Sequence, residues 1–131
     1  LDIFDQTLAA NLRLGKPDAT EDELLSALDK VGLLPWLQAQ PQGLQTALGE
    51  YGAAISGGQA RRVALARLLL KPRRVLLLDE PFAGLDTETR ERVWNSVREH
   101  QKQGLLIIVS HHEWDMGQCD VLTLKENVFI D

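Results

Sequence analysis

The sequence has 131 residues and 44% of them are apolar, so it is long enough for one domain or part of one and too apolar for a disordered chain. Its 19 acidic and 14 basic residues give a net charge of −5, which argues against non-specific binding to a nucleic-acid backbone. Six basic residues lie close together without interleaved aromatic residues to stack on bases: Arg61, Arg62, Arg67, Lys71, Arg73 and Arg74. We interpret them as a solvated helix face and expect no nucleic-acid partner.

The cysteine content and the apolar runs further restrict the kinds of protein to which this sequence can belong. Cys119 is the single cysteine, so it can form no internal disulfide, and we expect it to be a small, at least partly buried apolar residue. The longest apolar run, Leu105–Val109, is too short to span a bilayer. Any association with a membrane must therefore come through a partner or through sequence outside this chain.

The first half of the chain is predicted to be helical. Thr20 and Glu23 have the spacing of a capping box, and the helix after them has an apolar face that ends before Gly32. That face consists of Leu24, Leu25, Leu28 and Val31. Residues 35–52 contain proline and glycine, which predicts mostly loop with one short helix. Ser56 then precedes a helix that we expect to stop near Lys71 and Pro72.

The second half is predicted to alternate strands with a helix. Residues 75–78 are a continuous apolar run before an acidic pair, which is typical of a buried parallel strand. Asp86 can cap a helix that runs to about Gln103, and Leu105–Val109 reads as a second buried strand. Two further short strands are predicted at 121–124 and 128–130. This alternation indicates an α/β sheet that binds ligands at the carboxyl ends of its strands.

The segment Ser56-Gly57-Gly58-Gln59 begins a predicted helix. Two glycines allow close approach of an anion to free backbone amides, the helix dipole favours a phosphate, and the Ser56 hydroxyl adds a donor. A flexible helix-entry turn is the alternative interpretation.

The acidic pair Asp79-Glu80 follows the first predicted strand. A carboxylate there can hold Mg²⁺, and its neighbour can orient or deprotonate a water molecule. Adjacent strand residues point to opposite faces, so the backbone must turn for both to serve one site, and Pro81 favours such a turn. Two solvated acids at a strand end are the alternative.

The remaining candidates are weaker by themselves. Residues 83–86 read as a turn with an N-cap, and His111, after the second strand, is either a sensor of a terminal phosphate or a surface histidine. We interpret His100 and His112 as surface residues. A metal site made of His111, His112 and Cys119 lacks a fourth ligand at suitable spacing.

Taken in order, these motifs resemble the ATP-binding cassette (ABC) family over nearly the whole chain. Residues 55–67 resemble its signature motif and helix, and Val75–Asp79 resembles the Walker B strand, with Glu80 as the catalytic carboxylate. Residues 83–86 resemble the D-loop, and His111 resembles the switch histidine. The resemblance implies a P-loop NTPase-like α/β fold in which a helical signature subdomain precedes the parallel strands and helices of the catalytic core.

The resemblance also implies roles and partners. The cofactors would be ATP and Mg²⁺, with Asp79 holding the metal, Glu80 polarising water and His111 touching the γ-phosphate. Ser56 and Gly58, within the motif that also contains Gly57 and Gln59, would bind ATP seated on a second nucleotide-binding domain in a homo- or heterodimer, and Asp86 would connect the two sites. The other partner would be a transmembrane domain, which places the protein at the cytoplasmic face of the inner (plasma) membrane.

Details of two loops resemble exporters. Residues 46–52 resemble the loop that exporters use against their transmembrane domains, although Tyr51 stands where the family usually has arginine. Phe4 and residues 7–12 resemble the stretch just after the Q-loop. The run Tyr-Gly-Ala-Ala before the signature resembles the bacterial thiol (cysteine/glutathione) exporters linked to cytochrome bd assembly.

The chain contains no Gly-x-x-x-x-Gly-Lys-Ser/Thr loop. We expect that loop, the adenine-stacking aromatic residue and the Q-loop glutamine upstream of Leu1; Gln6 is not that glutamine, because it follows the Phe4 position. The chain would then be a partial, C-terminal piece of the ATPase domain, with the helical signature region at about 1–72 and the core from Walker B onwards at about 73–131. The alternatives are a soluble ABC-type ATPase, or a piece that is inactive by itself and serves as a folding or interaction module.

Overall fold

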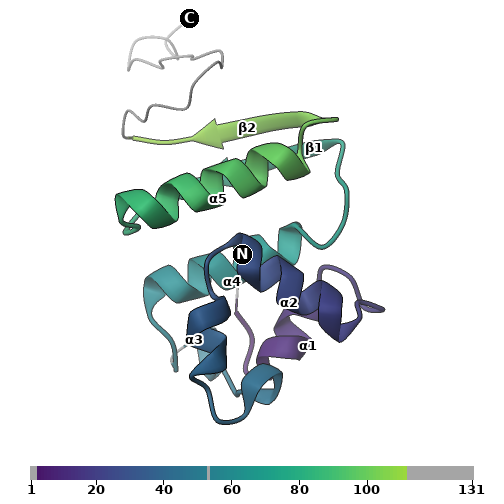
Figure 1. Ribbon diagram of the computed structural model, residues 1–131, viewed down its shortest axis with the longest axis vertical. Helices are drawn as coiled ribbons and strands as arrows, with labels where there is room; N and C mark the ends of the chain where they lie inside the picture. The colour runs from purple at the N-terminus through teal and green to yellow at the C-terminus, as the bar shows by residue number, and fades with distance from the viewer. Residues whose placement is uncertain (1–2, 53, 112–131) are drawn as a thin grey trace, which may run out of the picture.

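The computed structural model describes residues 3–52 and 54–111 (Figure 1). Four helices come first and gather in the lower part of the view, and β1, α5 and β2 follow above them. The strands predicted at 121–124 and 128–130, and the residues His112 and Cys119, lie outside the described residues. None of the described helices is both long and apolar enough to cross a bilayer.

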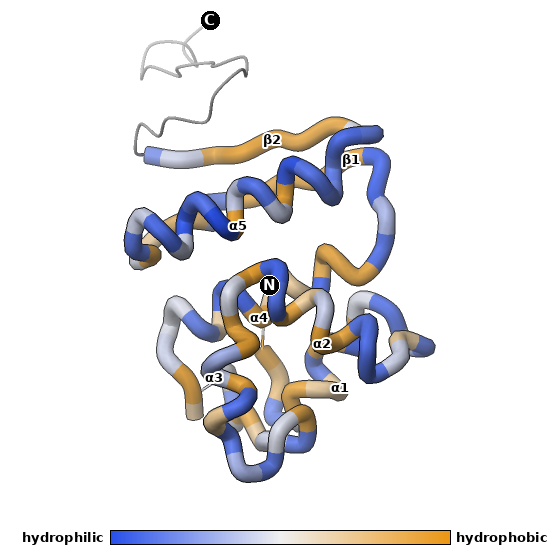
Figure 2. Tube along the Cα trace, in the orientation of Figure 1, coloured by the Kyte–Doolittle hydropathy of each residue, from blue (hydrophilic) through white to orange (hydrophobic). Residues whose placement is uncertain are grey.

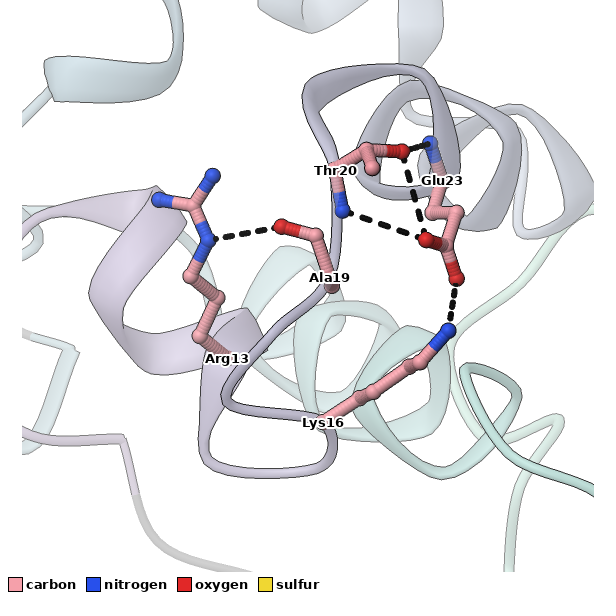
Figure 3. A network of polar contacts seen from close by, with 5 residues as sticks. All are labelled: Arg13, Lys16, Ala19, Thr20 and Glu23. Atoms are coloured by element: carbon pink, nitrogen blue, oxygen red, sulfur yellow. Dashed lines mark hydrogen bonds and ion pairs between the residues drawn. The ribbon is translucent and has the colours of Figure 1, made fainter.

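The helical part begins with α1 (Leu8–Arg13), α2 (Glu21–Lys30) and α3 (Leu34–Gln38). The predicted capping box of α2 is present, since Glu23 N donates to Thr20 Oγ1 at 3.2 Å and Thr20 N donates to Glu23 Oε1 at 3.2 Å. Figure 3 shows how this helix start is joined to α1: Lys16 pairs with Glu23, and Arg13 Nε donates to the Ala19 carbonyl at 3.0 Å. The sequence therefore specifies the start of α2, and Arg13 and Lys16 tie that start to the preceding segment.

The end of α2 also follows the predicted pattern. Gly32 has a φ of +74°, and its amide donates to Asp29 O while Leu33 N donates to Leu28 O at 2.9 Å. These two bonds form a Schellman motif, which ends a helix at a left-handed residue. After α3, the predicted loop contains two short 3₁₀ helices, η1 (Gly43–Gln45) and η2 (Glu50–Gly52).

The last helix of this part, α4 (Gly57–Leu68), passes through the helical core. Val63 and Ala66 on this helix are fully buried, together with the leucines of α1 and α2: Leu8, Leu12, Leu24 and Leu28. Each fully buried leucine stabilises the fold by about 1.5–3 kcal/mol relative to an exposed one. This core holds α4, and therefore the Ser-Gly-Gly-Gln segment at its start, in a fixed place.

The second part is a βαβ unit. Strands β1 (Val75–Asp79) and β2 (Leu105–Val109) pair in parallel and are connected by α5 (Thr87–His100). Val93 and Val97 on α5 are fully buried, as are Leu76 and Leu78 of β1 to within a few per cent. The parallel α/β arrangement agrees with the predicted fold class.

One prediction about the strands is wrong. Both were expected to be buried, but each exposes alternate residues, with Leu77 60% and Ile107 42% exposed. The strands form a two-stranded sheet in the described residues, and the face that carries Leu76 and Leu78 is the one turned to the core. Figure 2 shows β2 as a continuous apolar strand, the composition that parallel strands have when both faces are covered.

Candidate functional site

The carboxyl ends of β1 and β2 lie side by side. The register pairs Asp79 with Val109, so Glu80 and Ser110 both leave the sheet at the same edge. Glu80 N donates to Val109 O at 2.8 Å, and the Glu80 carboxylate accepts hydrogen bonds from Ser110 Oγ at 3.3 Å and from the backbone N–H of His111. Glu80, a half-buried carboxylate, is therefore held against the end of the neighbouring strand.

The backbone turns between Asp79 and Glu80, which is the turn that both carboxylates need in order to serve one site. Glu80 has a φ of +48°, in the left-handed region that a side chain with a Cβ rarely adopts. Asp79 ends β1 with an exposed side chain, on the same alternation as Val75 and Leu77. A strained residue of this kind is typical of positions whose surroundings fix the backbone for a function.

His111 reaches this edge through its main chain. Its side chain is exposed, and its backbone N–H donates to the Glu80 carboxylate. Sequence reasoning assigned the imidazole and not the amide, so the amide contact and the Ser110 hydroxyl contact were both missed. The parallel register was the signal, because it aligns the residues that follow β1 and β2.

The Ser-Gly-Gly-Gln segment forms the start of α4. Gln59 N donates to Ser56 Oγ at 3.1 Å, and Ser56 N donates to Gln59 Oε1 at 3.1 Å, which completes a capping box. A Cβ added at Gly57 or Gly58 would meet nothing within 4 Å. Glycine at a helix start lowers stability relative to alanine, and here neither backbone strain nor crowding requires it. The open space above both glycines fits close approach of an external group to the backbone.

Asp86 caps α5 as predicted. Its Oδ1 accepts from Thr89 N at 2.7 Å. Hydrogen bonding from the Thr89 side chain has the largest effect in lowering the pKa of Asp86, and the Thr89 amide has the next largest. A smaller attraction comes from Arg62 on α4, whose own pKa is lowered by burial. Arg62 Nη1 donates to the carbonyls of Val31 and Gly32, both at 3.3 Å.

The basic residues of α4 differ from the predicted solvated face. Arg67 is only 6% exposed, and its Nε donates to Asn11 O at 3.0 Å. Arg61 is exposed, but its Nη1 donates to Ala83 O at 2.9 Å, which links α4 to the turn after Glu80. The prediction was wrong for Arg67, and the signal was its position one helical turn after the buried Val63.

The segments that resemble exporter contact regions are neighbours. Thr7 and Ala47 form an antiparallel bridge, flanked by bonds from Leu8 N to Thr46 O at 2.8 Å and from Leu48 N to Gln6 O at 3.1 Å. The segment around Thr7 and the segment around Ala47, which are far apart in the sequence, are therefore paired at the start of α1.

Comparisons with known proteins agree with this arrangement. The family model described as ABC transporter matches residues 3–83. The chain is 48% identical over 107 residues to the transport ATP-binding protein AarD of Providencia stuartii, covering 82% of this chain and 18% of that protein. It is 40% identical over 121 residues to the glutathione/L-cysteine transport system ATP-binding/permease protein CydD of Escherichia coli (strain K12), covering 92% of this chain and 21% of that protein.

A solved structure of a bacterial Atm1-family ABC exporter with ATP bound superposes with a TM-score of 0.79 at 32% identity, covering 85% of this chain and 19% of that one. The chain spans about a fifth of the length of the relatives it matches. The chain belongs to the ABC transporter family and carries sequence of that family's nucleotide-binding ATPase domain.

Proposed function

We propose that this chain is the C-terminal part of the nucleotide-binding domain of an ATP-driven exporter. The observation that carries the proposal is the meeting of Glu80 with Ser110 and His111 at the carboxyl edge of a parallel sheet, directly after Asp79. That edge is where α/β folds bind ligands, and two adjacent carboxylates there suit metal-assisted phosphoryl transfer.

The residues divide the chemistry between them. When bound, ATP supplies the γ-phosphoryl group and Mg²⁺ neutralises its charge. Asp79 is an exposed carboxylate at the strand end and would hold Mg²⁺, directly or through water. Glu80 would orient the attacking water and take its proton, and His111 would donate to the γ-phosphate.

Ser56, Gly57, Gly58 and Gln59 would face ATP on a second nucleotide-binding domain. Their helix start offers backbone amides and a favourable dipole, and the open space above the glycines supports that use. The Ser56 oxygen accepts from Gln59 N, which leaves its hydroxyl proton to donate to a phosphate oxygen. Asp86 would link the two nucleotide sites in the resulting homo- or heterodimer.

The division of the chain forms part of the proposal. The helical signature region would occupy about 1–72 and the core from Walker B onwards about 73–131, which follows the order of α1 to α4 and then β1, α5 and β2. The phosphate-binding loop would lie in sequence upstream of Leu1. Without it, this chain by itself should neither bind ATP at micromolar concentration nor hydrolyse it, and calorimetry with Mg-ATP measures this directly.

The exporter assignment adds a transmembrane domain at the cytoplasmic face of the inner (plasma) membrane. The bridge between Thr7 and Ala47 supports it, because it joins the two segments that resemble exporter contact regions. The name of the CydD relative points to thiols, glutathione or cysteine, as the transported class. A soluble ABC-type ATPase is the second candidate. That function would not explain why the two segments that resemble exporter contact regions lie side by side.

Inside-out vesicles containing the intact protein test the proposal. We expect ATP-dependent uptake of radiolabelled glutathione or cysteine that Glu80→Gln abolishes. ATP hydrolysis with no uptake of either thiol would remove the thiol assignment, and hydrolysis by a protein that stays in the soluble fraction would favour the second candidate. Absence of hydrolysis in the intact protein would contradict the proposed function itself.

A further inference from the structure

The turn from Glu80 to Asp86 is anchored by side chains at several points. Phe82 is 2% exposed and packs edge-to-face on Trp94 of α5, with ring centroids 6.2 Å apart and an interplanar angle of 88°. Asp86 ends the turn by capping α5. Between them, the carbonyl of Ala83 accepts a hydrogen bond from Arg61 Nη1 at 2.9 Å.

The Arg61 contact differs from the other anchors because it comes from α4. Phe82 and Asp86 tie the turn to α5, the helix that follows it directly, whereas Arg61 lies 22 positions earlier. Arg61 follows Gln59 by two residues, so it belongs to the same first turns of α4 as the Ser56–Gln59 capping box. The guanidinium also lies over Gly84, where an added Cβ would come within 3.7 Å of Nη1.

The turn closes back on Glu80. Ala83 N donates to Glu80 O at 3.4 Å, and Leu85 N donates to Phe82 O at 3.2 Å. Glu80 keeps a φ of +48°, a conformation that persists only when surrounding contacts fix it. Ala83 is therefore joined by a hydrogen bond to the backbone that carries the Glu80 carboxylate.

We propose that Arg61 is a positioning residue that makes the orientation of Glu80 depend on the position of the start of α4. Arg61 acts by holding the Ala83 carbonyl. The inference rests on the proposed function and adds regulation to the same site: when α4 moves with a ligand bound at Ser56–Gln59, the turn that carries Glu80 moves with it. Arg62 and Arg92 reinforce the junction nearby, by binding the end of α2 from α4 and from α5.

Arg61→Met in the intact transporter tests this inference, because methionine keeps the aliphatic stem and the helix propensity but removes every donor. We expect kcat for ATP hydrolysis to fall by about threefold to tenfold with KM for ATP unchanged, since small misplacements at a catalytic centre lower turnover. Arg61→Lys keeps one donor and should recover most of the rate. Arg74→Met is the matched control: Arg74 is also exposed, and the described residues contain no hydrogen-bond partner for its side chain.

Amide hydrogen exchange provides a second readout that a general loss of stability would not reproduce. In Arg61→Met the amides of Ala83 and Leu85 should exchange several-fold faster, while those of α2 and β2 stay at their wild-type rates. Equal kcat in Arg61→Met and Arg74→Met, or an effect confined to KM, overturns the inference. Loss of hydrolysis in Glu80→Gln together with normal kcat in Arg61→Met would reject only the role of Arg61. Absence of hydrolysis in the wild-type transporter would instead reject the proposed function.

Discussion

The carboxylate of Glu80 accepts a hydrogen bond from the backbone N–H of His111, although 31 positions separate the two residues. The contact follows from the parallel pairing of β1 with β2, which brings both residues to one edge of the sheet. Glu80 is therefore held in place by the second strand, and its side chain does not depend on its own loop alone. This arrangement makes the role of Glu80 testable by a change that keeps its shape.

Glu80→Gln should abolish turnover and preserve nucleotide binding. The amide has the size of the carboxylate but cannot accept a proton from water, so we expect steady-state ATP hydrolysis by the intact transporter to fall by at least about 100-fold. Binding of Mg-ATP, measured by calorimetry, should stay close to wild type. Glu91→Gln on the exposed side of α5 is the matched control and should hydrolyse ATP normally. Near-normal hydrolysis by Glu80→Gln would exclude Glu80 from the catalytic role.

Ser56→Arg and Gly58→Asp should block dimerisation more than nucleotide binding. Both changes fill the open space at the start of α4, and an aspartate there also repels phosphate. In a Glu80→Gln background, ATP-driven dimer formation should weaken at least about tenfold, or about 1.4 kcal/mol. Size-exclusion chromatography measures the dimer, and Ser26→Arg on the exposed side of α2 is the control for the added charge. Unchanged dimers would mean that these residues do not face a partner's nucleotide.

The local structure was largely predictable because local signals fix it. The Thr20–Glu23 capping box, the stop at Gly32 and the cap at Asp86 each depend on residues within one helical turn, and the structure confirms all three. The need for a turn after Asp79 was also predictable, since strand geometry places adjacent side chains on opposite faces. The left-handed backbone of Glu80 provides that turn.

Long-range contacts were not predictable in the same way. The reach of Arg61 to Ala83 depends on how α4 packs against a distant segment, and the charged side chain gives no sign of that packing. For Arg67 the spacing from Val63 indicated a buried helix face, but it did not indicate that Asn11 would be the partner. The exposed face of the sheet is a similar case. The apolar residues of the strands predicted that other segments bury both faces of the sheet. A run of apolar residues does not specify which segment buries each face.

Asp86 should titrate below its ordinary pKa of 3.8, because hydrogen bonds from Thr89 stabilise the carboxylate. A depressed pKa means that the carboxylate contributes its stabilisation of α5 fully above the unfolded value and loses it as the pH falls through the folded value. The carboxyl ¹³C shift of Asp86 followed by NMR gives the midpoint directly. Thr89→Val removes the hydroxyl and should move the midpoint back towards 3.8. A wild-type midpoint at or above 3.8 would contradict the observed cap.

Asn11→Ala should destabilise the helical part strongly. Asn11 is fully buried; its Oδ1 accepts from Phe4 N at 2.8 Å, and its Nδ2 donates to Phe4 O and Thr7 O, both at 3.0 Å. Alanine removes these three bonds and leaves the Phe4 N–H without its acceptor, so the free energy of unfolding should fall by about 2–4 kcal/mol in urea titrations at dilute concentration. Asn95→Ala on exposed α5 should change it by less than about 0.5 kcal/mol. Equal effects of the two changes would show that the buried network is not a source of stability.

The exposed sheet face should make the isolated chain associate. Leu77 and Ile107 are paired in register and are 60% and 42% exposed, next to Val75 and Leu105 at more than half exposed. Removing such a contiguous apolar surface from water is favourable, so light scattering should show dimers or larger species at micromolar concentration. Leu77→Lys places a charge on this face and should shift the chain to monomer with its circular dichroism intact. Leu76→Lys places the same charge on the face turned to the core, where Leu76 is 2% exposed, and should unfold the βαβ unit instead. A wild-type chain that stays monomeric, or two lysine variants that behave alike, would show that the two faces of β1 do not differ in solution as they do in the structure.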